Sequence, residues 1–271
     1  MDIDCSKIKL YGFNNLTKTL SFNFYDICYA HTPAHQREYL NYIDEVYSTN
    51  RLQQVLCEVV EIIGASVLNV SAHDYEPRGS SVTCLIAEKP APPEAMISGT
   101  HVEERNAALK QSAVFHLDKS HVTAHTYPES HPDHGVSTFR VDIDVATCGR
   151  VSPLEALDFL IGSFDEDIII LDYRVRGFTR DTLGKKHYID HEITSIQEFL
   201  SEKTRHQYQV TDMNVEQGNI FHTRMKLLDF SLENYLFGED THAFHEDELQ
   251  VIERQLRKEM NEIYYGVSTF G

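Results

Sequence analysis

The sequence lacks the long apolar stretches and the paired cysteines that are typical of membrane and secreted proteins. No run approaches the roughly 20 apolar residues that a membrane-spanning helix needs, although 41% of the 271 residues are hydrophobic and can form a core. Residues 1–10 lack a charged region followed by an apolar one, so they do not resemble a secretory signal. We therefore expect a cytoplasmic protein without a membrane partner.

Cysteines are few, odd in number and far apart, which indicates neither a disulfide framework nor a zinc knuckle. The sequence has five: Cys5, Cys28, Cys57, Cys84 and Cys148.

Positive charge is also scarce, because the sequence has 24 Lys and Arg residues against 42 Asp and Glu residues, which gives a net charge of −18. Such a field repels nucleic acid and tolerates a cationic ligand. We expect no nucleic-acid partner.

Neither an internal repeat nor a low-complexity segment interrupts the chain, and one α+β domain over residues 1–271 is expected. Alternation of apolar and polar residues predicts strands over 7–13, 20–29, 66–76, 81–88, 114–127, 137–147, 168–175, 208–214 and 220–228. Helical spacing covers 34–47, 50–63, 152–164, 194–202 and 246–264, and residues 89–106 form an aperiodic insertion. Strands in pairs and helices in pairs favour a largely antiparallel sheet with helices packed on one face, a two-layer α/β sandwich.

The strand expected over residues 137–147 has two chemically different faces. Apolar side chains alternate there with the polar Arg140, Asp142 and Asp144. Because successive side chains of a strand point to opposite faces, Cys148 shares the parity of the polar set. The purely structural interpretation is that Cys148 is a cysteine at the end of a strand, packed beside the sheet.

The most unusual stretch is rich in histidine and contains a serine. Five of the fifteen histidines fall between residues 116 and 134: His116, His121, His125, His131 and His134. From the residues alone, three interpretations of Ser120 and its neighbours stay open. They are a polar strand that leads into a proline turn, a histidine metal site, and a serine hydrolase. The metal site lacks a CxxC or HExxH frame, and the hydrolase lacks a GxSxG motif around Ser120.

A fourth interpretation comes from resemblance. The sequence resembles the S-adenosylmethionine decarboxylase proenzymes, in their longer bacterial form. The most specific block is Lys119-Ser120-His121 followed by His125-Thr126-Tyr127-Pro128-Glu129. Further matching segments span nearly the whole chain: 12–18, 25–30, 74–77, 145–149, 172–181, 189–192 and 263–266.

The resemblance implies that the chain cleaves itself. The Ser120 hydroxyl would attack the carbonyl of Lys119, the resulting ester would break by elimination, and the serine residue would end as a pyruvoyl group. The products would be a β chain of residues 1–119 and an α chain of residues 120–271. The pyruvoyl ketone would then form a Schiff base with an amino-acid substrate and serve as an electron sink for decarboxylation.

The resemblance also assigns roles to other residues. His125 matches the processing base, Cys148 matches the proton donor to the substrate carbon, and Ser81 or Ser112 matches a processing serine. No metal ligand is predicted. Ser120 and His125 are five residues apart and would face opposite sides of an unbroken strand, so we expect a bulge or turn near residues 122–124.

The implied substrate is S-adenosylmethionine, whose decarboxylation makes the aminopropyl donor for spermidine. Ornithine or arginine is the alternative substrate within pyruvoyl decarboxylases, and a histidine-based metalloenzyme is the alternative from another class. An oligomer of α/β pairs is expected from the resemblance. The resemblance also makes Mg²⁺ a candidate activator, although neither Asp142/Asp144 nor Asp165-Glu166-Asp167 is specific enough to name as its ligands.

Overall fold

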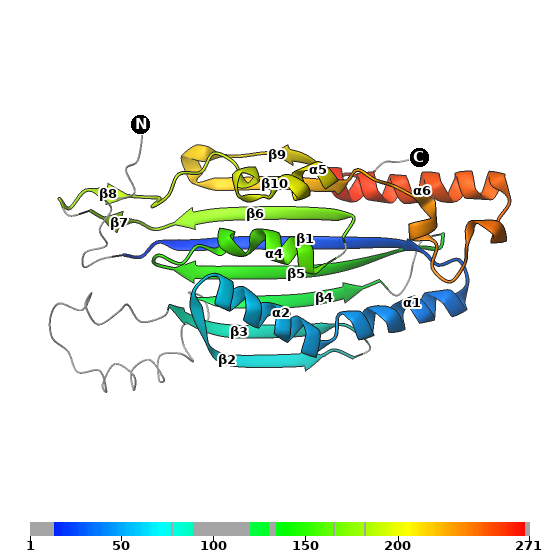
Figure 1. The fold of residues 1–271 in the computed structure, drawn as a ribbon, viewed down its shortest axis with the longest axis horizontal. Helices are drawn as coiled ribbons and strands as arrows, with labels where there is room; N and C mark the ends of the chain where they lie inside the picture. The colour runs from blue at the N-terminus through cyan, green and yellow to red at the C-terminus, as the bar shows by residue number, and fades with distance from the viewer. Residues whose placement is uncertain are drawn as a thin grey trace.

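A single antiparallel sheet dominates the computed structural model, which describes residues 14–76, 78–88, 120–129, 134–164, 166–181 and 183–268. The sheet has eight strands in the order β2-β3-β4-β5-β1-β6-β10-β9 (Figure 1). The strands are β1 (Thr17–Tyr29), β2 (Ala65–Asp74), β3 (Ser80–Glu88), β4 (His121–Pro128), β5 (Val136–Cys148), β6 (Ile168–Arg176), β9 (Tyr208–Asp212) and β10 (Ile220–Leu227). A separate small sheet pairs β7 (Thr179–Arg180) with β8 (Lys186–His187). The expected strand over 7–13 and the expected insertion over 89–106 lie outside the described residues.

The helices of the described chain are α1 (Pro33–Val46), α2 (Thr49–Ile62), α4 (Leu157–Ser163), α5 (Glu202–Gln207) and α6 (Glu246–Tyr265). Short 3-10 turns are η4 (Pro153–Ala156), η5 (Ile196–Phe199), η6 (Glu216–Gly218), η7 (Leu232–Tyr235) and η8 (Thr241–Ala243). The helix predicted over 194–202 is instead η5 followed by α5. Two serine caps explain the difference, because Ser195 accepts a hydrogen bond from the Gln197 amide and Ser201 accepts one from the Thr204 amide. No helix in the described segments is long and apolar enough to cross a membrane.

The main core lies on one face of the sheet. Along β1 the alternate residues Leu20, Phe22 and Phe24 are completely buried, and the helices α1, α2 and α4 contribute to the same cluster. In Figure 1 these helices lie in front of the strands. The predicted apolar stripe of α2 is buried there, as its Leu52 and Val59 illustrate.

A second, smaller cluster lies on the opposite face. It joins α6 to Ile27 of β1, Ile168 of β6 and Val136 of β5. On β1 and β6 these residues have the opposite parity to the main-core residues Phe24 and Ile169, so α6 packs against the other side of one end of the sheet. The α+β class and the antiparallel sheet are confirmed, and α6 adds a partial third layer to the expected two.

The rest of that opposite face carries polar side chains. Asp142 and Asp144 of β5 lie beside Asn23 and Ser21 of β1 in the register, and His125 of β4 lies opposite Asp142. All of these side chains are half-buried or exposed within the described chain. We call this region of β4, β5 and β1 the polar face. Because packing does not require these side chains, the polar face is available for chemistry.

Candidate active site

Ser120 lies immediately before the first paired residue of β4. His121, the next residue, is paired with Leu85 of β3 and with Ala146 of β5. The Ser120 carbonyl accepts a hydrogen bond from the Ile86 amide at 3.2 Å, and Ser120 itself is half-buried. The peptide bond before Ser120 therefore precedes the β4 ladder, and breaking it would leave every strand pairing of β4 intact.

Cys148 lies at the same end of the neighbouring strand. It is the last residue of β5, pairs with Thr17 of β1 and is half-buried. Since Ala146 pairs with His121, Cys148 ends β5 two residues beyond the pairing level of His121. This is the end of the sheet where Ser120 precedes β4. Neighbouring strands are about 4.8 Å apart. The structure thus brings Ser120 and Cys148 to one end of the sheet, with Cys148 on the parity of the polar face as the sequence indicated.

His125 lies elsewhere on the same strand. It pairs with Ser81 of β3 and Asp142 of β5, and the Tyr75 hydroxyl is 3.3 Å from its Nδ1. The pairing of β4 is continuous on both sides, so the predicted bulge near residues 122–124 is wrong. At about 3.3 Å per residue, His125 is about 16 Å along the strand from Ser120 and points to the opposite face. Within one chain, these two residues are not brought together.

The surroundings of His125 are tightly hydrogen bonded. The Asp142 carboxylate accepts hydrogen bonds from Asn23 Nδ2 at 2.6 Å and from Arg140 Nε at 2.7 Å. The Arg140 guanidinium also lies over the Tyr127 ring, 4.9 Å from its centroid. Its hydrogen bond to Asp142 raises the pKa of Arg140 further above its usual range, so the guanidinium stays charged.

Asp144 and Asp167, two of the acidic residues that were considered for magnesium, are engaged in similar ways. Asp144 accepts a hydrogen bond from the Ser21 hydroxyl. Asp167 is buried and accepts hydrogen bonds from the Ile27 amide at 2.8 Å and the Tyr235 hydroxyl at 2.7 Å. Asp165 and Ser112 lie outside the described residues. Activation by magnesium therefore finds no support.

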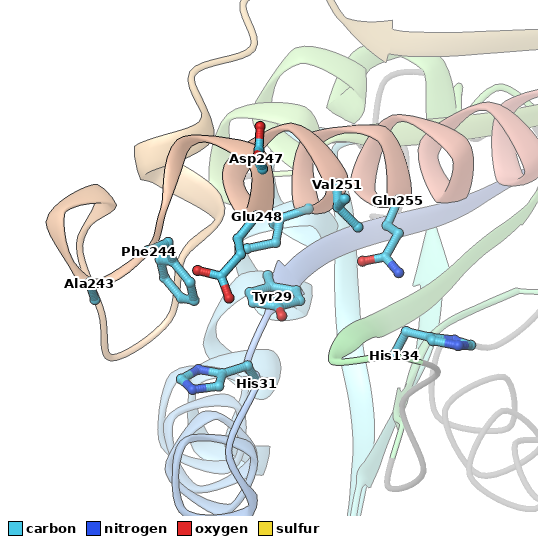
Figure 2. A pocket seen from close by; sticks show the side chains of 10 residues that line it. Tyr29, His31, His134, Ala243, Phe244, Asp247, Glu248, Val251 and Gln255 are labelled. Atoms are coloured by element: carbon cyan, nitrogen blue, oxygen red, sulfur yellow. The ribbon is translucent and has the colours of Figure 1, made fainter.

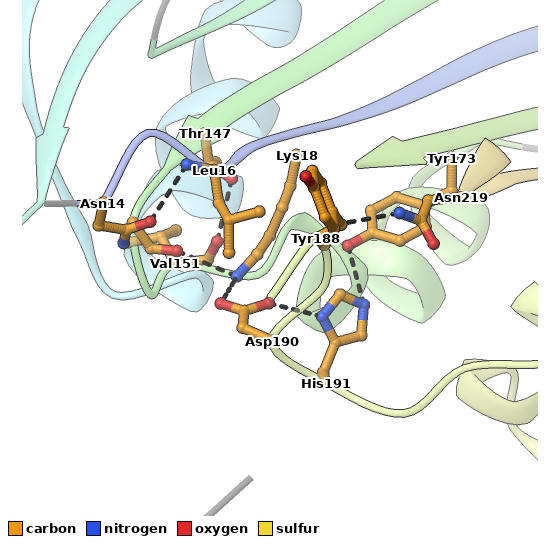
Figure 3. Close-up of polar contacts among 11 residues, drawn as sticks. Asn14, Leu16, Lys18, Thr147, Val151, Tyr173, Tyr188, Asp190, His191 and Asn219 are labelled. Carbon is orange, nitrogen blue, oxygen red and sulfur yellow. Dashed lines mark hydrogen bonds and ion pairs between the residues drawn. The ribbon is translucent and has the colours of Figure 1, made fainter. Parts of the chain in front are cut away.

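A buried lysine near Cys148 was missed by the sequence reasoning. Lys18 is 2% exposed, its Nζ donates a hydrogen bond to the Gly149 carbonyl at 3.1 Å, and it forms an ion pair with Asp190 at 2.8 Å (Figure 3). The sequence did carry a signal, because Lys18 has the same parity as the apolar Leu16, just before β1, and Leu20 within it, and both are buried. A lysine at a core position needs a partner.

The ion pair extends into a chain of hydrogen bonds. Asp190 Oδ1 is 2.8 Å from His191 Nδ1, and His191 Nε2 is 3.0 Å from the Tyr173 hydroxyl. Burial by itself raises the pKa of Asp190, but the hydrogen bonds and charges of His191 and Lys18 outweigh it, so the net pKa is lowered. Asp190 is therefore a stable anion that holds Lys18 against the backbone turn after Cys148.

Comparison with known proteins identifies the family. The family model described as S-adenosylmethionine decarboxylase matches residues 40–177. An S-adenosylmethionine decarboxylase proenzyme from Halorhodospira halophila is 59% identical over 264 residues, which cover 97% of this chain and 96% of that protein. One from Hahella chejuensis is 60% identical over 260 residues, which cover 96% of this chain and 97% of that protein. The chain belongs to the S-adenosylmethionine decarboxylase family.

The resemblance seen in the sequence is thereby confirmed at the level of the family. Among solved structures, the adenosylmethionine decarboxylase of Aquifex aeolicus is 14% identical, covers 60% of this chain and 91% of its own, and has a TM-score of 0.30. That score is too low for a comparison of the two sites.

In this decarboxylase-family chain, a cavity of about 550 Å³ lies at the other end of the sheet from Ser120. Its lining includes Tyr29 at the end of β1, together with Phe244 and Glu248 near the start of α6 (Figure 2). β1 runs for thirteen residues from Thr17, the partner of Cys148, to Tyr29, and such a strand is about 40 Å long. The cavity is therefore separate from the candidate active site.

The histidine-based metal site is not supported around Ser120. Neither His121 nor His125 belongs to a group of three potential ligands within 4.8 Å of one another, as judged over the described part of the chain. His187 Nε2 is 2.9 Å from Asp181 Oδ2, and His191 is held by Asp190. His116 and His131 lie outside the described residues.

Proposed function

We propose that this chain is an S-adenosylmethionine decarboxylase proenzyme that acts in the cytoplasm, where it supplies the aminopropyl donor for spermidine synthesis. It cleaves its own bond between Lys119 and Ser120 before it can act. The observation that carries this proposal is the identity of 59% to a decarboxylase proenzyme over 97% of the chain. The place of Ser120, immediately before β4 and at the same end of the sheet as Cys148, supports cleavage at that bond.

The strand order indicates that the two fragments stay associated after cleavage. The fragment before Ser120 contains β1, β2 and β3, and the fragment from Ser120 onward contains the remaining strands of the sheet. β1 is inserted between β5 and β6, and β3 pairs with β4. Three ladders therefore join the two fragments, and separating them would expose the main core. The cleaved protein remains one folded domain.

Ser120 fits the role of a cofactor precursor, because it is half-buried and its carbonyl is anchored to Ile86. The pyruvoyl group supplies a ketone that captures the substrate amine and takes up the electrons released as CO₂ leaves. Cys148, at the same end of the sheet, returns a proton to the substrate carbon. Lys18 holds the Gly149 carbonyl and thereby fixes the backbone that follows Cys148, so we assign it as a positioning residue.

His125 supports an assembly of α/β pairs. The continuous β4 ladder keeps His125 about 16 Å from Ser120 of the same chain, yet His125 and Cys148 share the polar face. A second copy that covers this face as far as its Cys148 end, where Ser120 precedes β4, would bring its own His125 toward Ser120. We therefore propose that the processing base comes from a second copy. Mixing the Ser120→Ala and His125→Ala proenzymes tests this, because only a mixed assembly can unite an intact Ser120 with an intact His125.

In that mixture, cleavage of the His125→Ala chain is expected, whereas each variant alone stays uncut. An uncut mixture that sediments as a hybrid oligomer would overturn the proposal that a second copy supplies the processing base, and it would leave the family assignment untouched. A control mixture uses the Ser21→Ala proenzyme in place of the Ser120→Ala one, since Ser21 lies on the polar face but has no role in the proposed cleavage. This control chain cleaves by itself and supplies an intact His125.

Intact mass and product release test the function itself. We expect two fragments that meet at Lys119 and Ser120, with a pyruvoyl group at the start of the larger one. Labelled CO₂ should be released from carboxyl-labelled S-adenosylmethionine and not from labelled ornithine or arginine. An uncut chain with full activity contradicts the mechanism, and release from ornithine or arginine alone contradicts the substrate.

A further inference from the structure

A second cluster of chemically reactive side chains lies far from Ser120, where α1 begins. His31, His35 and Glu239 each offer a ligand atom, and these atoms all lie within 4.8 Å of one another. His31 precedes the N-cap residue Thr32, and His35 lies in the first turn of α1. Glu239 comes from the segment between η7 and η8, about two hundred residues later in the chain. The fold therefore brings together three potential metal ligands that are remote in sequence.

The His35 ring is only partly satisfied by protein contacts. Its Nδ1 is buried and has no hydrogen-bond partner in the described chain, and its Nε2 is 3.9 Å from Glu239 Oε1. That separation is too long for a hydrogen bond. It is shorter than the sum of two bonds of about 2.0–2.1 Å each, the usual length for zinc to imidazole nitrogen or carboxylate oxygen. One ion can therefore contact both side chains without a large movement.

The backbone holds these ligands in place. Gly238 has a φ of +79°, and a Cβ added there would lie 2.9 Å from Cδ2 of the His35 ring, so the chain before Glu239 is pressed directly onto that ring. The adjacent Phe237 amide donates to the Tyr29 carbonyl at 2.9 Å. On the other side, the His35 amide donates to the Thr32 hydroxyl at 3.1 Å. Both segments are thus fixed by contacts that do not involve the ligand atoms.

His31 completes the cluster from the solvent side. Its ring is 5.7 Å from the His35 ring and 5.4 Å from the Phe244 ring, centroid to centroid. Figure 2 shows His31 at the start of α1, beside the cavity lined by Tyr29 and Phe244. His31 is exposed, so an ion can enter there and keep a water molecule as its remaining ligand.

We propose that His31, His35 and Glu239 form a binding site for a zinc-like divalent transition metal ion. Two imidazoles and one carboxylate suit zinc and its first-row neighbours, whereas Mg²⁺ and Ca²⁺ prefer sites made of oxygen. The ion would tie the start of α1 to the segment that leads into α6. If the chain is cut before Ser120, which rests on the proposed function, the same ion would link the two fragments, because both histidines precede the cut and Glu239 follows it.

Titration of the metal-free full chain with Zn²⁺ tests the site, with the Ser120→Ala background used to keep the chain uncut. We expect one ion per chain by calorimetry, and Co²⁺ should give the visible absorption of a tetrahedral site. His35→Gln and Glu239→Gln should each weaken Zn²⁺ binding by about tenfold or more. Glu239 is partly exposed, so Glu239→Gln is expected to fold normally, which circular dichroism checks.

His242→Gln is the matched control. His242 is an exposed histidine of the neighbouring η8 turn and is outside the cluster, so its loss should leave Zn²⁺ binding unchanged. Mg²⁺ titrated in the same way should produce no saturable binding. The proposal is overturned if the parent binds no stoichiometric Zn²⁺, or if His35→Gln and Glu239→Gln bind it as tightly as the control. Because these experiments use uncut protein, neither result depends on whether cleavage occurs.

Discussion

The two faces of β5 carry different kinds of side chain. On one face Phe139, Val141, Ile143 and Val145 are all completely buried against the helices. On the other, Arg140, Asp142, Asp144 and Cys148 lie on the polar face. The same strand thus serves stability with one set of side chains and is free to serve chemistry with the other. Changes on the core face should cost folding free energy, and a change of Cys148 on the polar face should cost activity.

The largest effect is expected for Ser120→Ala, because the proposed cleavage and cofactor both need its hydroxyl. We predict complete loss of cleavage and of CO₂ release, with a single cooperative unfolding transition that shows the uncut chain to be folded. Gel electrophoresis, intact mass and calorimetry measure these quantities. Ser21→Ala, a change on the polar face away from Ser120, should still be cut. Residual decarboxylation by the uncut Ser120→Ala chain would refute the role of Ser120.

Cys148→Ala separates chemistry from processing. Since general acids typically contribute about 10²–10⁴-fold to a rate, we predict a fall of that order in kcat while cleavage before Ser120 continues. Steady-state kinetics on fully cut protein provides the measurement. Cys57→Ala is the matched control, because Cys57 is also a half-buried cysteine but belongs to α2. Equal kcat values for the two variants would remove Cys148 from the mechanism.

Phe22→Ala probes the core face of β1, where the side chain is completely buried. Truncating such a residue typically costs about 3–5 kcal/mol, from lost burial and the cavity left behind. Urea unfolding should show that loss, whereas kcat per folded molecule changes little. Thr123→Ala, on the half-buried polar side of β4, should stay within about 0.5 kcal/mol of the parent. Equal losses of unfolding free energy in the two variants would contradict the proposed difference between the core face and the polar face.

The smallest expected effect concerns how the free energy of unfolding depends on pH through Asp190, the partner of Lys18. The pKa of Asp190 is lowered below its ordinary value of 3.8 in the folded protein. A lowered pKa stabilises the folded state at pH values above the ordinary pKa, and this contribution is lost as the pH falls toward the pKa of the folded protein. The unfolding free energy of the parent should therefore fall more steeply between about pH 5 and pH 2 than that of Asp190→Asn. Identical slopes would show that Asp190 is not stabilised by Lys18 and His191.

Much of the fold followed from local patterns. Alternation and helical spacing predicted β5, α2 and the buried stripe of α2, because each depends on which side chains avoid water. The split into η5 and α5 was not predicted, since a second serine cap competes with a single continuous helix. The position of α6 was not predicted either, because its amphipathic stripe fits a core on either face of the sheet.

The features of the candidate site also divide into those that the sequence predicted and those that depended on strand pairing. The motif around Ser120 and the parity of Cys148 could be taken from the sequence, because both are local properties of the chain. The distance between Ser120 and His125 depended on an unbroken β4, which only the pairing with β3 and β5 enforces.

By itself, the sequence determined the family, the α+β class and the serine at which the chain is proposed to cleave, since these follow from residue identity and spacing. Tertiary structure alone decided which partners meet. Lys18 reaches Gly149 and Asp190, and His35 reaches Glu239, across more than a hundred residues. Such contacts arise when the sheet closes around its core, and no local pattern specifies them.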